Sequence, residues 1–578
     1  MLQLRARNNV FLKFVELTTV IVLLTHSAVP ADTCGKPPNT ANDKIKYVMY
    51  LSSKPQDSAQ CTMEVANGKI VIKDPVSNPA MSCPDMFSWK LYTEAITQEF
   101  WKNWAADQQT WPGVACDPSD PKCKSSNPLP LCKAGGGNCC DPDSLHNPGY
   151  DDKNNPAKYC PYFPGDHVAE FPGGMPLRIG MPPSKAHLVS FEANPQIHAR
   201  LMALATEEPG RKIRQSMAEI VFRNRSMFDY TFRNNLYNQE GIIQVFNNNS
   251  ANIRPGAPYR KQSVPGALAE IDYPLDAVMI KSNWISKERA LKIGLKDDPE
   301  NPYIKMNILS PVTDNNGTIL EPGEHWLVAF HVSSKDVPNW IWATFEHVDN
   351  LGRCDFTGCN DSYGYSSGDD VPAGLATNFT TPHIACDDLL LPSVVFDLGK
   401  TYPGGTRSQS LSTVFQALGI GTTDNTTLTP TPKDKGWLSY RLKGSQAQFT
   451  DSMGRTTHLG NSVTEGGFVN SSSCVSCHAR AGTTGKGTLP PALSVFISQL
   501  SDSGYLESSH GIPNPDWYNR SSQPPDLTVL QTDFVWGFLT ANCVTDKCQP
   551  AVLMRAMAEE ETKEETKKPT VRSRTDAH

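Results

Sequence analysis

Alternating apolar and polar residues in the central third of the chain predict a β-sheet. Runs rich in β-branched and aromatic residues are separated there by turns that contain Pro, Gly, Asn and Asp. The runs are residues 277–285, 303–309, 325–332, 340–348 and, less clearly, 436–449. A connection as short as residues 333–339 favours antiparallel pairing of its neighbours. Residues 44–51 and 69–73 are two further short strand candidates.

A different periodicity predicts helices. Residues 88–104 carry aromatic and aliphatic side chains at intervals of three and four, which form one face of an amphipathic helix. Residues 196–236 show a helical pattern that is interrupted at Pro209-Gly210, and residues 408–418 predict a short helix. Helices packed on a mainly antiparallel sheet indicate the α+β class.

Length and charge limit the classes of function. A chain of 578 residues is long enough for two or three domains, or for one large domain with insertions. The formal net charge is -7, and the sequence has no basic stripe. We therefore expect no nucleic-acid partner.

The N-terminus resembles a secretory signal peptide over residues 1–31. Three basic residues precede a short apolar run at residues 17–24, and Val29-Pro30-Ala31 has the small residues of a cleavage site. The run is too short to span a bilayer, although an uncleaved anchor is a second interpretation. We expect a periplasmic or secreted protein with no stable membrane span after cleavage.

The cysteines indicate an oxidising compartment. All 16 follow Ala31, and six of them lie in a Gly-, Pro-, Asn- and Asp-rich loop at residues 116–160. Such a loop has few apolar residues to bury, so we expect a disulfide-rich insertion; a zinc or iron–sulfur cluster is the alternative. The pairs Cys354/Cys359 and Cys543/Cys548 have the spacing of local loop clips.

A single CxxCH motif lies at Cys474-Val475-Ser476-Cys477-His478. In this attachment sequence two thiols bond to the porphyrin of haem c and the histidine binds its iron. Random placement of 16 Cys and 13 His in 578 residues would give the motif ~0.01 times. A CxxC disulfide and half of a zinc site are the other interpretations, and zinc would need a second ligand pair. We expect one covalent haem c with Cys474 and Cys477 as thioethers and His478 as the proximal iron ligand.

The sixth iron ligand has several candidates, of which His347 is preferred. The strand period of two places His347 on the same face as Ile341, Ala343 and Phe345. It is therefore either a buried core histidine or a distal haem group. The other candidates are His458, His510, Met453, Met554 and Met557. Arg455, Arg480 and Gln446 are candidate partners of the haem propionates, although a surface role is the simpler interpretation for each.

Four segments resemble a family of large, mostly uncharacterised bacterial monohaem c-type cytochrome-like proteins. The segments are residues 436–482 with the CxxCH, residues 88–104, WIWATFEHVDN at 340–350 and QTDFVW at 531–536. The resemblance implies one covalent haem in an exported protein, and it brings no settled substrate. The cysteine-rich loop looks like an elaboration on the family pattern.

These observations divide the chain into regions and leave more than one function open. We expect a signal peptide at 1–31, an α+β domain at 32–435, a haem-binding region at 436–557 and a charged, disordered tail at 558–578. Single-electron transfer to a redox partner protein is the first hypothesis. A haem-dependent oxidase, peroxidase or oxygenase acting on a small-molecule substrate is the second, and a haem-based binding or sensor protein is the third.

Overall fold

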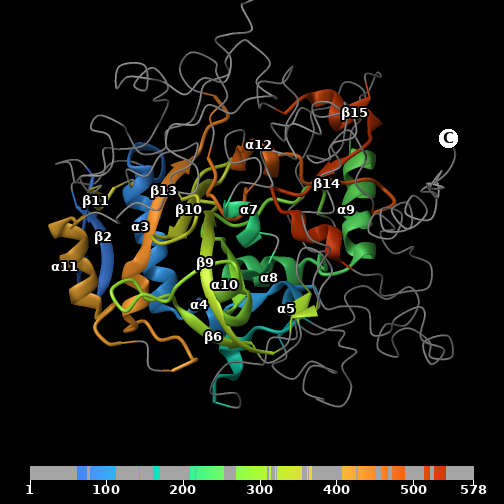
Figure 1. Ribbon diagram of the computed structural model, residues 1–578. Helices are drawn as coiled ribbons and strands as arrows, with labels where there is room; N and C mark the ends of the chain where they lie inside the picture. Colours follow the sequence, from blue (N-terminus) through green and yellow to red (C-terminus); the bar gives the residue numbers. More distant parts are fainter. Residues whose placement is uncertain are drawn as a thin grey trace, which may run out of the picture.

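The computed structural model is organised around a seven-stranded antiparallel sheet (Figure 1). Its strands lie in the order β13-β10-β9-β5-β4-β3, and β6 pairs with β9 outside this path. Their bounds are β3 Ala105–Ala106, β4 Met217–Arg223, β5 Val278–Ser286, β6 Lys305–Ile308, β9 Gly323–Ser334, β10 Ile341–His347 and β13 Tyr440–Gln446. The strand β13 of the predicted haem-binding region pairs with β10 of the predicted α+β domain, so the two regions share one sheet.

The structure describes part of the chain. The described residues are 61–73, 78–111, 142–143, 161–169, 209–214, 216–252, 268–308, 312–313, 319–320, 322–353, 361, 363–366, 406–424, 427–450, 457, 459–466, 472–487, 513–520 and 526–541. The signal peptide, the loop at 116–160 with its six cysteines, the two predicted loop clips and the charged tail lie outside these residues.

The alternation of apolar residues predicted the central strands correctly. The strands β5, β6, β9, β10 and β13 all fall within or beside the predicted runs, and the α+β class is confirmed. The candidate at 69–73 is β2 Lys69–Lys73, which pairs with β1 Thr62–Ala66. The candidate at 44–51 lies outside the described residues. Short two-stranded sheets are formed by β7 Val312–Thr313 with β8 Ile319–Leu320, β11 Tyr365–Ser366 with β12 Thr406–Arg407, β14 Gly482–Thr483 with β17 Leu530–Gln531, and β15 Asn519–Arg520 with β16 Asp526–Leu527.

The helical prediction for residues 196–236 is wrong in its middle part. The described part of this region contains α7 Pro209–Arg214, then the strand β4, then α8 Arg225–Arg233. β4 lies between β5 and β3 and is buried along most of its length. A strand that is buried on both faces has a continuous apolar run, and periodicity alone does not separate such a run from a buried helix.

The other predicted helices are present with small changes. Residues 88–104 form α3 Pro84–Thr97 and α4 Phe100–Asn103, and the backbone turns at Glu99, whose φ is 51°. Residues 408–418 form α11 Gln409–Leu418. The remaining helices are α2 Pro79–Ser82, α5 Asp107–Thr110, α9 Gln239–Asn252, α10 Lys287–Lys292 and α12 Cys474–His478, with short 3-10 turns at η2 Pro164–His167, η4 Lys435–Ser439, η8 Pro515–Trp517 and η9 Trp536–Thr540.

The central sheet has a hydrophobic core on each side. The first core packs α3 and α11 against residues such as Ile341, Ala343 and Phe345 of β10. The second core joins α8, α9 and α12 with Trp340 and Trp342. Figure 1 shows α3 and α11 on one side of β10 and β9, and α9 and β14 on the other.

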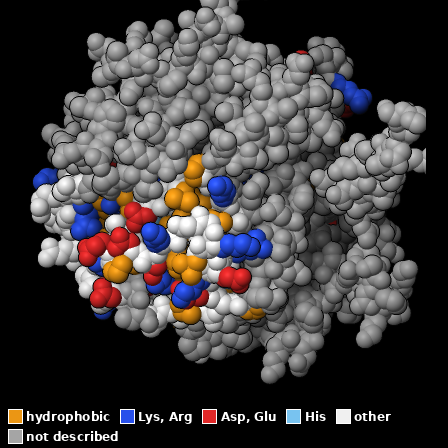
Figure 2. All heavy atoms as spheres, viewed as in Figure 1, with side chains coloured by type: hydrophobic (Ala, Val, Ile, Leu, Met, Phe, Trp, Pro, Cys, Tyr) orange, Lys and Arg blue, Asp and Glu red, His pale blue; other side chains and the backbone are white. Residues whose placement is uncertain are grey.

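The described residues include one disulfide, Cys61–Cys83, which belongs to the first core. Among these residues, no helix is long and apolar enough to cross a membrane. On the face shown in Figure 2, the described acidic and basic side chains lie close together.

Candidate functional site

The CxxCH motif forms the single helical turn α12 Cys474–His478. Cys474 is buried and Cys477 is half-buried, and both are in the thiol form. Residues three apart on a helix lie on the same side. The two cysteine side chains therefore lie on one side of the turn, as attachment to a single porphyrin would require.

His478 is oriented by a backbone carbonyl. Its Nδ1 lies 2.8 Å from the carbonyl oxygen of Phe534, a residue 56 positions further along the chain. Because a carbonyl can only accept, Nδ1 carries the proton and the lone pair lies on Nε2. Histidines that bind metals usually donate their second nitrogen in this way. The orientation of His478 therefore fits an iron ligand.

Gln446 at the end of β13 fixes the start of α12. Its Oε1 accepts a hydrogen bond from Val475 N at 2.9 Å, and its Nε2 donates to Thr457 O at 2.9 Å and to Ser473 Oγ at 3.1 Å. The side chain is fully buried, so the surface role predicted for Gln446 is wrong. Its amide group holds α12, the candidate haem-attachment turn (below, the attachment turn), to the sheet.

Arg480 brings a buried positive charge close to the attachment turn. It is 1% exposed, and its guanidinium lies 4.6 Å from the ring centroid of Trp517. The neighbouring Tyr518 hydroxyl donates to Ala479 O at 2.5 Å. Burial raises the pKa of Tyr518, and the charge of Arg480 opposes that rise. A surface role is therefore wrong for Arg480 too, and its charge suits a propionate.

Aromatic side chains form the wall beside His478. The ring of Trp342 has its centroid 4.3 Å from that of His478, and Phe534 lies 6.2 Å from Trp342. These rings belong to the second core together with Cys474 and Leu459. The attachment turn is thus bordered by apolar surface, which suits the porphyrin face.

The structure does not bring His347 beside His478. Trp342 is the β10 residue whose ring contacts His478, and His347 lies five residues further along, a distance of about 17 Å. Because Trp342 and His347 are an odd number of positions apart, their side chains also lie on opposite faces of the strand. His347 instead stacks on Tyr303, with ring centroids 3.6 Å apart, on the side of the sheet predicted for it.

A buried glutamate, Glu346, lies on the same face of β10 as Trp342, and no motif in the sequence marks it as a site residue. Glu346 Oε2 accepts hydrogen bonds from Ser462 N at 3.1 Å and Ser462 Oγ at 2.7 Å. Its Oε1 lies 3.6 Å from Lys443 Nζ. These contacts fix the segment between β13 and α12 across the sheet.

His331 on β9 is a second residue that the sequence reasoning missed. In the register of the sheet His331 is opposite Thr344, so it is a diagonal neighbour of Trp342. It is 8% exposed, and its Nε2 lies 3.3 Å from Glu465 Oε1. Only strand register reveals this proximity, and register could not be read from the composition of the strands.

The remaining ligand candidates lie outside the described residues. They are His458, His510, Met453, Met554 and Met557, and Arg455 is outside as well. Within the described parts of the chain, no group of three or more His, Cys, Asp and Glu side chains is arranged to hold a metal ion.

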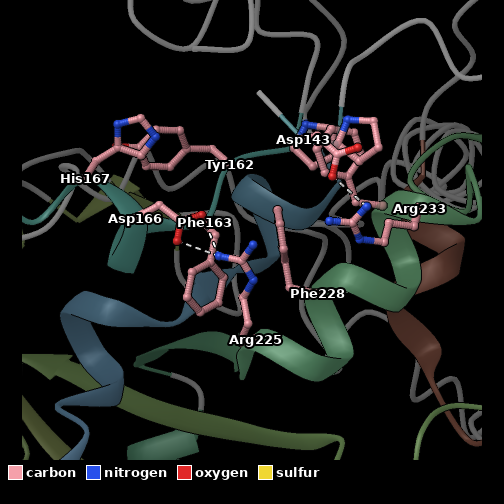
Figure 3. Close-up of a pocket in the computed structure, with 11 residues that line it drawn as sticks. Asp143, Tyr162, Phe163, Asp166, His167, Arg225, Phe228 and Arg233 are labelled. Atoms are coloured by element: carbon pink, nitrogen blue, oxygen red, sulfur yellow. Dashed lines mark hydrogen bonds and ion pairs between the residues drawn. The ribbon is translucent and has the colours of Figure 1, made fainter. Parts of the chain in front are cut away.

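A separate pocket of about 200 Å³ lies beside α8 (Figure 3). Arg225 Nη1 is 2.5 Å from Asp166 Oδ1, and Arg233 Nη1 is 2.8 Å from Asp143 Oδ1. The aromatic part of its wall is made by Tyr162, Phe163, Phe228 and Phe232. An anionic ligand would have to compete with these carboxylates for the guanidinium groups. No residue of the CxxCH turn lines the pocket.

Comparison with known proteins adds no assignment, because no protein-family model, curated protein or solved structure matches this chain. Any function proposed for this chain therefore depends on the residues of the site.

Proposed function

We propose that this chain is an exported c-type cytochrome-like protein that binds one covalent haem and transfers single electrons to a redox partner. Cys474 and Cys477 would form the thioethers, and His478 would be the proximal iron ligand. The observation that carries the proposal is the hydrogen bond from His478 Nδ1 to Phe534 O at 2.8 Å, on the same helical turn as both thiols.

The attachment chemistry needs only the two thiols. Each thiol adds across one vinyl group, so that a C–S bond forms and the thiol hydrogen ends on the neighbouring carbon. No oxidant or leaving group is required. When bound, the haem supplies a one-electron couple. The chain orients Nε2 of His478 and borders the attachment turn with Trp342 and Phe534.

The location is part of the same proposal. The Cys61–Cys83 disulfide supports export, because such bonds persist mainly in oxidising compartments. We propose a periplasmic or secreted protein in which the segment before Asp32 serves as the signal.

A haem-dependent oxidoreductase is the second candidate, and the buried polar groups near Trp342 favour it. His331, Glu465 and Glu346 supply an imidazole and two carboxylates on the same face of the sheet. Proton transfer by such groups is the usual protein contribution to oxidase or peroxidase chemistry. In a pure electron carrier these groups would have only the structural role that their contacts with Ser462 and Asn461 indicate.

Export of the full chain in a host that matures c-type cytochromes tests the proposal. We expect one haem per chain that survives acidified acetone. The double variant C474S/C477S should lose it, and the matched control C61S/C83S should keep it. Colourless wild-type protein from that host, or colour that acetone removes, would overturn the proposal.

Spectra of the ferric and ferrous protein separate the two candidates. Low-spin, six-coordinate iron that does not bind CO would support electron transfer. A high-spin form that binds CO or reacts with peroxide would support the oxidoreductase instead.

A further inference from the structure

Three residues with strained backbone lie close together near His478. Trp340, Asp533 and Phe534 have φ values of 60°, 46° and 65°. Residues with a Cβ rarely adopt this left-handed conformation, because it costs free energy, and it persists where the surroundings enforce it. Asp533 and Phe534 are consecutive, and Trp340 donates from Nε1 to Asp533 Oδ1 at 3.1 Å.

The carboxylate of Asp533 provides the enforcing contacts. Its Oδ1 also accepts a hydrogen bond from Lys335 Nζ at 2.6 Å, and its Oδ2 accepts one from Tyr273 N at 2.7 Å. The side chain is buried, with 6% exposed. Lys335 and Trp340 lie in the connection between β9 and β10, and Tyr273 precedes β5, so two separate segments fix the turn at Asp533 against the sheet.

The carbonyl that orients His478 belongs to the residue after Asp533. Any rotation of the turn at Asp533 and Phe534 moves the Phe534 carbonyl oxygen away from His478 Nδ1. We infer that Asp533 is a positioning residue, which holds the Phe534 carbonyl on His478 and thereby fixes the tautomer and basicity of the imidazole. The inference rests on the proposed function, in which Nε2 of His478 binds haem iron.

A redox consequence follows from this arrangement. A firm hydrogen bond at Nδ1 makes the imidazole a stronger electron donor at Nε2, which favours the ferric form. Loss of the Asp533 contacts should weaken that bond and raise the reduction potential. A residue with a merely structural role would lower stability without moving the potential in a fixed direction.

The variants D533A and D533N, made in the full exported chain, test the inference. Alanine removes all three contacts and tolerates the φ of 46° poorly. Asparagine accepts that conformation and keeps an oxygen acceptor for Lys335 and Trp340, but it loses the contact with Tyr273 N and the negative charge that pairs with Lys335. The matched control is D272N, because Asp272 is the other carboxylate bound to Lys335, at 3.1 Å.

At a fixed electrode potential, we expect the ferric-to-ferrous ratio to fall about 10-fold in D533A. It should fall less in D533N and stay unchanged in D272N. In the haem-free C474S/C477S background, nitrogen NMR of labelled histidine should show His478 fixed as the Nδ1–H tautomer. Adding D533A to that background should produce a mixture of tautomers, whereas adding D272N should not.

The two readouts separate failure of this inference from failure of the proposed function. Haem that attaches with the same potential in wild type, D533N and D533A overturns the inference and leaves the proposed function standing. Absence of covalent haem in wild type overturns the proposed function, and the NMR result then decides the positioning role alone. If D533A does not fold, a D533N potential equal to wild type, with His478 still a single tautomer, also counts against the inference.

Discussion

His347 is a neutral imidazole in the interior of the protein. Burial lowers its pKa to about 3, and backbone hydrogen bonds with Pro302 and Asn301 oppose that shift only partly. Its Nδ1 accepts a hydrogen bond from Asp349 N at 3.2 Å, and its ring stacks on Tyr303. Protonation would place an uncompensated charge in this stack, so His347 makes folding sensitive to acid.

Replacing His347 by Phe should reduce the loss of stability in acid. The pKa of a histidine is roughly 6.5 in the unfolded chain, and that of His347 is lower in the folded protein. The contribution of neutral His347 to the free energy of unfolding is therefore complete above the unfolded pKa, and it is lost as the pH falls toward the folded pKa. Between pH 7 and pH 4 the free energy of unfolding of wild type should fall by about 3 kcal/mol more than that of H347F. Urea titrations at the two pH values measure this. Equal losses in both proteins would show that His347 is not the group responsible.

At the residue scale, the sequence predicted which face a side chain occupies better than which partner it meets. The period of two placed His347 with Ile341 and Phe345, as the structure shows. It could not show that His478 meets Phe534, because the two are 56 residues apart and the contact is to a carbonyl. Backbone acceptors leave no signature in the side-chain sequence.

The helix α12 is too short to be stable alone. It has 5 residues, whereas isolated helices below roughly 12 residues are marginal in water. Its conformation must come from its neighbours, and the strand β13 supplies the main fixed contact through Gln446. The attachment turn is therefore positioned by the sheet.

Replacing Gln446 by Leu tests this dependence. The substitution leaves Val475 N without its acceptor in a buried site, which should destabilise the protein by about 1–3 kcal/mol. Amide hydrogen exchange at Val475 and Cys477 should become faster. The control Q448L, two residues along at an exposed position, should change neither quantity. Unchanged exchange in Q446L would show that α12 is held by other contacts.

At the element scale, the success of prediction depended on how each strand is buried. The runs that became β9 and β10 were recognised from their β-branched and aromatic residues and short connection. The run that forms β4 resembles a helix in sequence, because side chains on both of its faces are largely buried and its apolar residues do not alternate with polar ones. Pairing order and register depend on contacts between distant segments, so single runs could not reveal them.

At the scale of the whole molecule, the two sides of the central sheet have different roles. The first core contains α3, the hairpin of β1 and β2, and the Cys61–Cys83 disulfide. The second core contains α12 and the aromatic wall beside His478. Because the sheet separates them, the first core can stabilise the fold without touching the candidate haem site.

Removing the disulfide tests that separation at the scale of the molecule. The disulfide joins residues with a sequence separation of 22. Because this cross-link restricts the unfolded chain, its loss should lower the free energy of unfolding by about 3 kcal/mol. The variant C61S/C83S should therefore unfold at lower urea concentration, as wild type should after reduction. Its covalent haem content and its spectrum should stay at wild-type values, because the substituted residues lie in the first core. A changed haem spectrum in C61S/C83S would show that the two cores are coupled through the sheet.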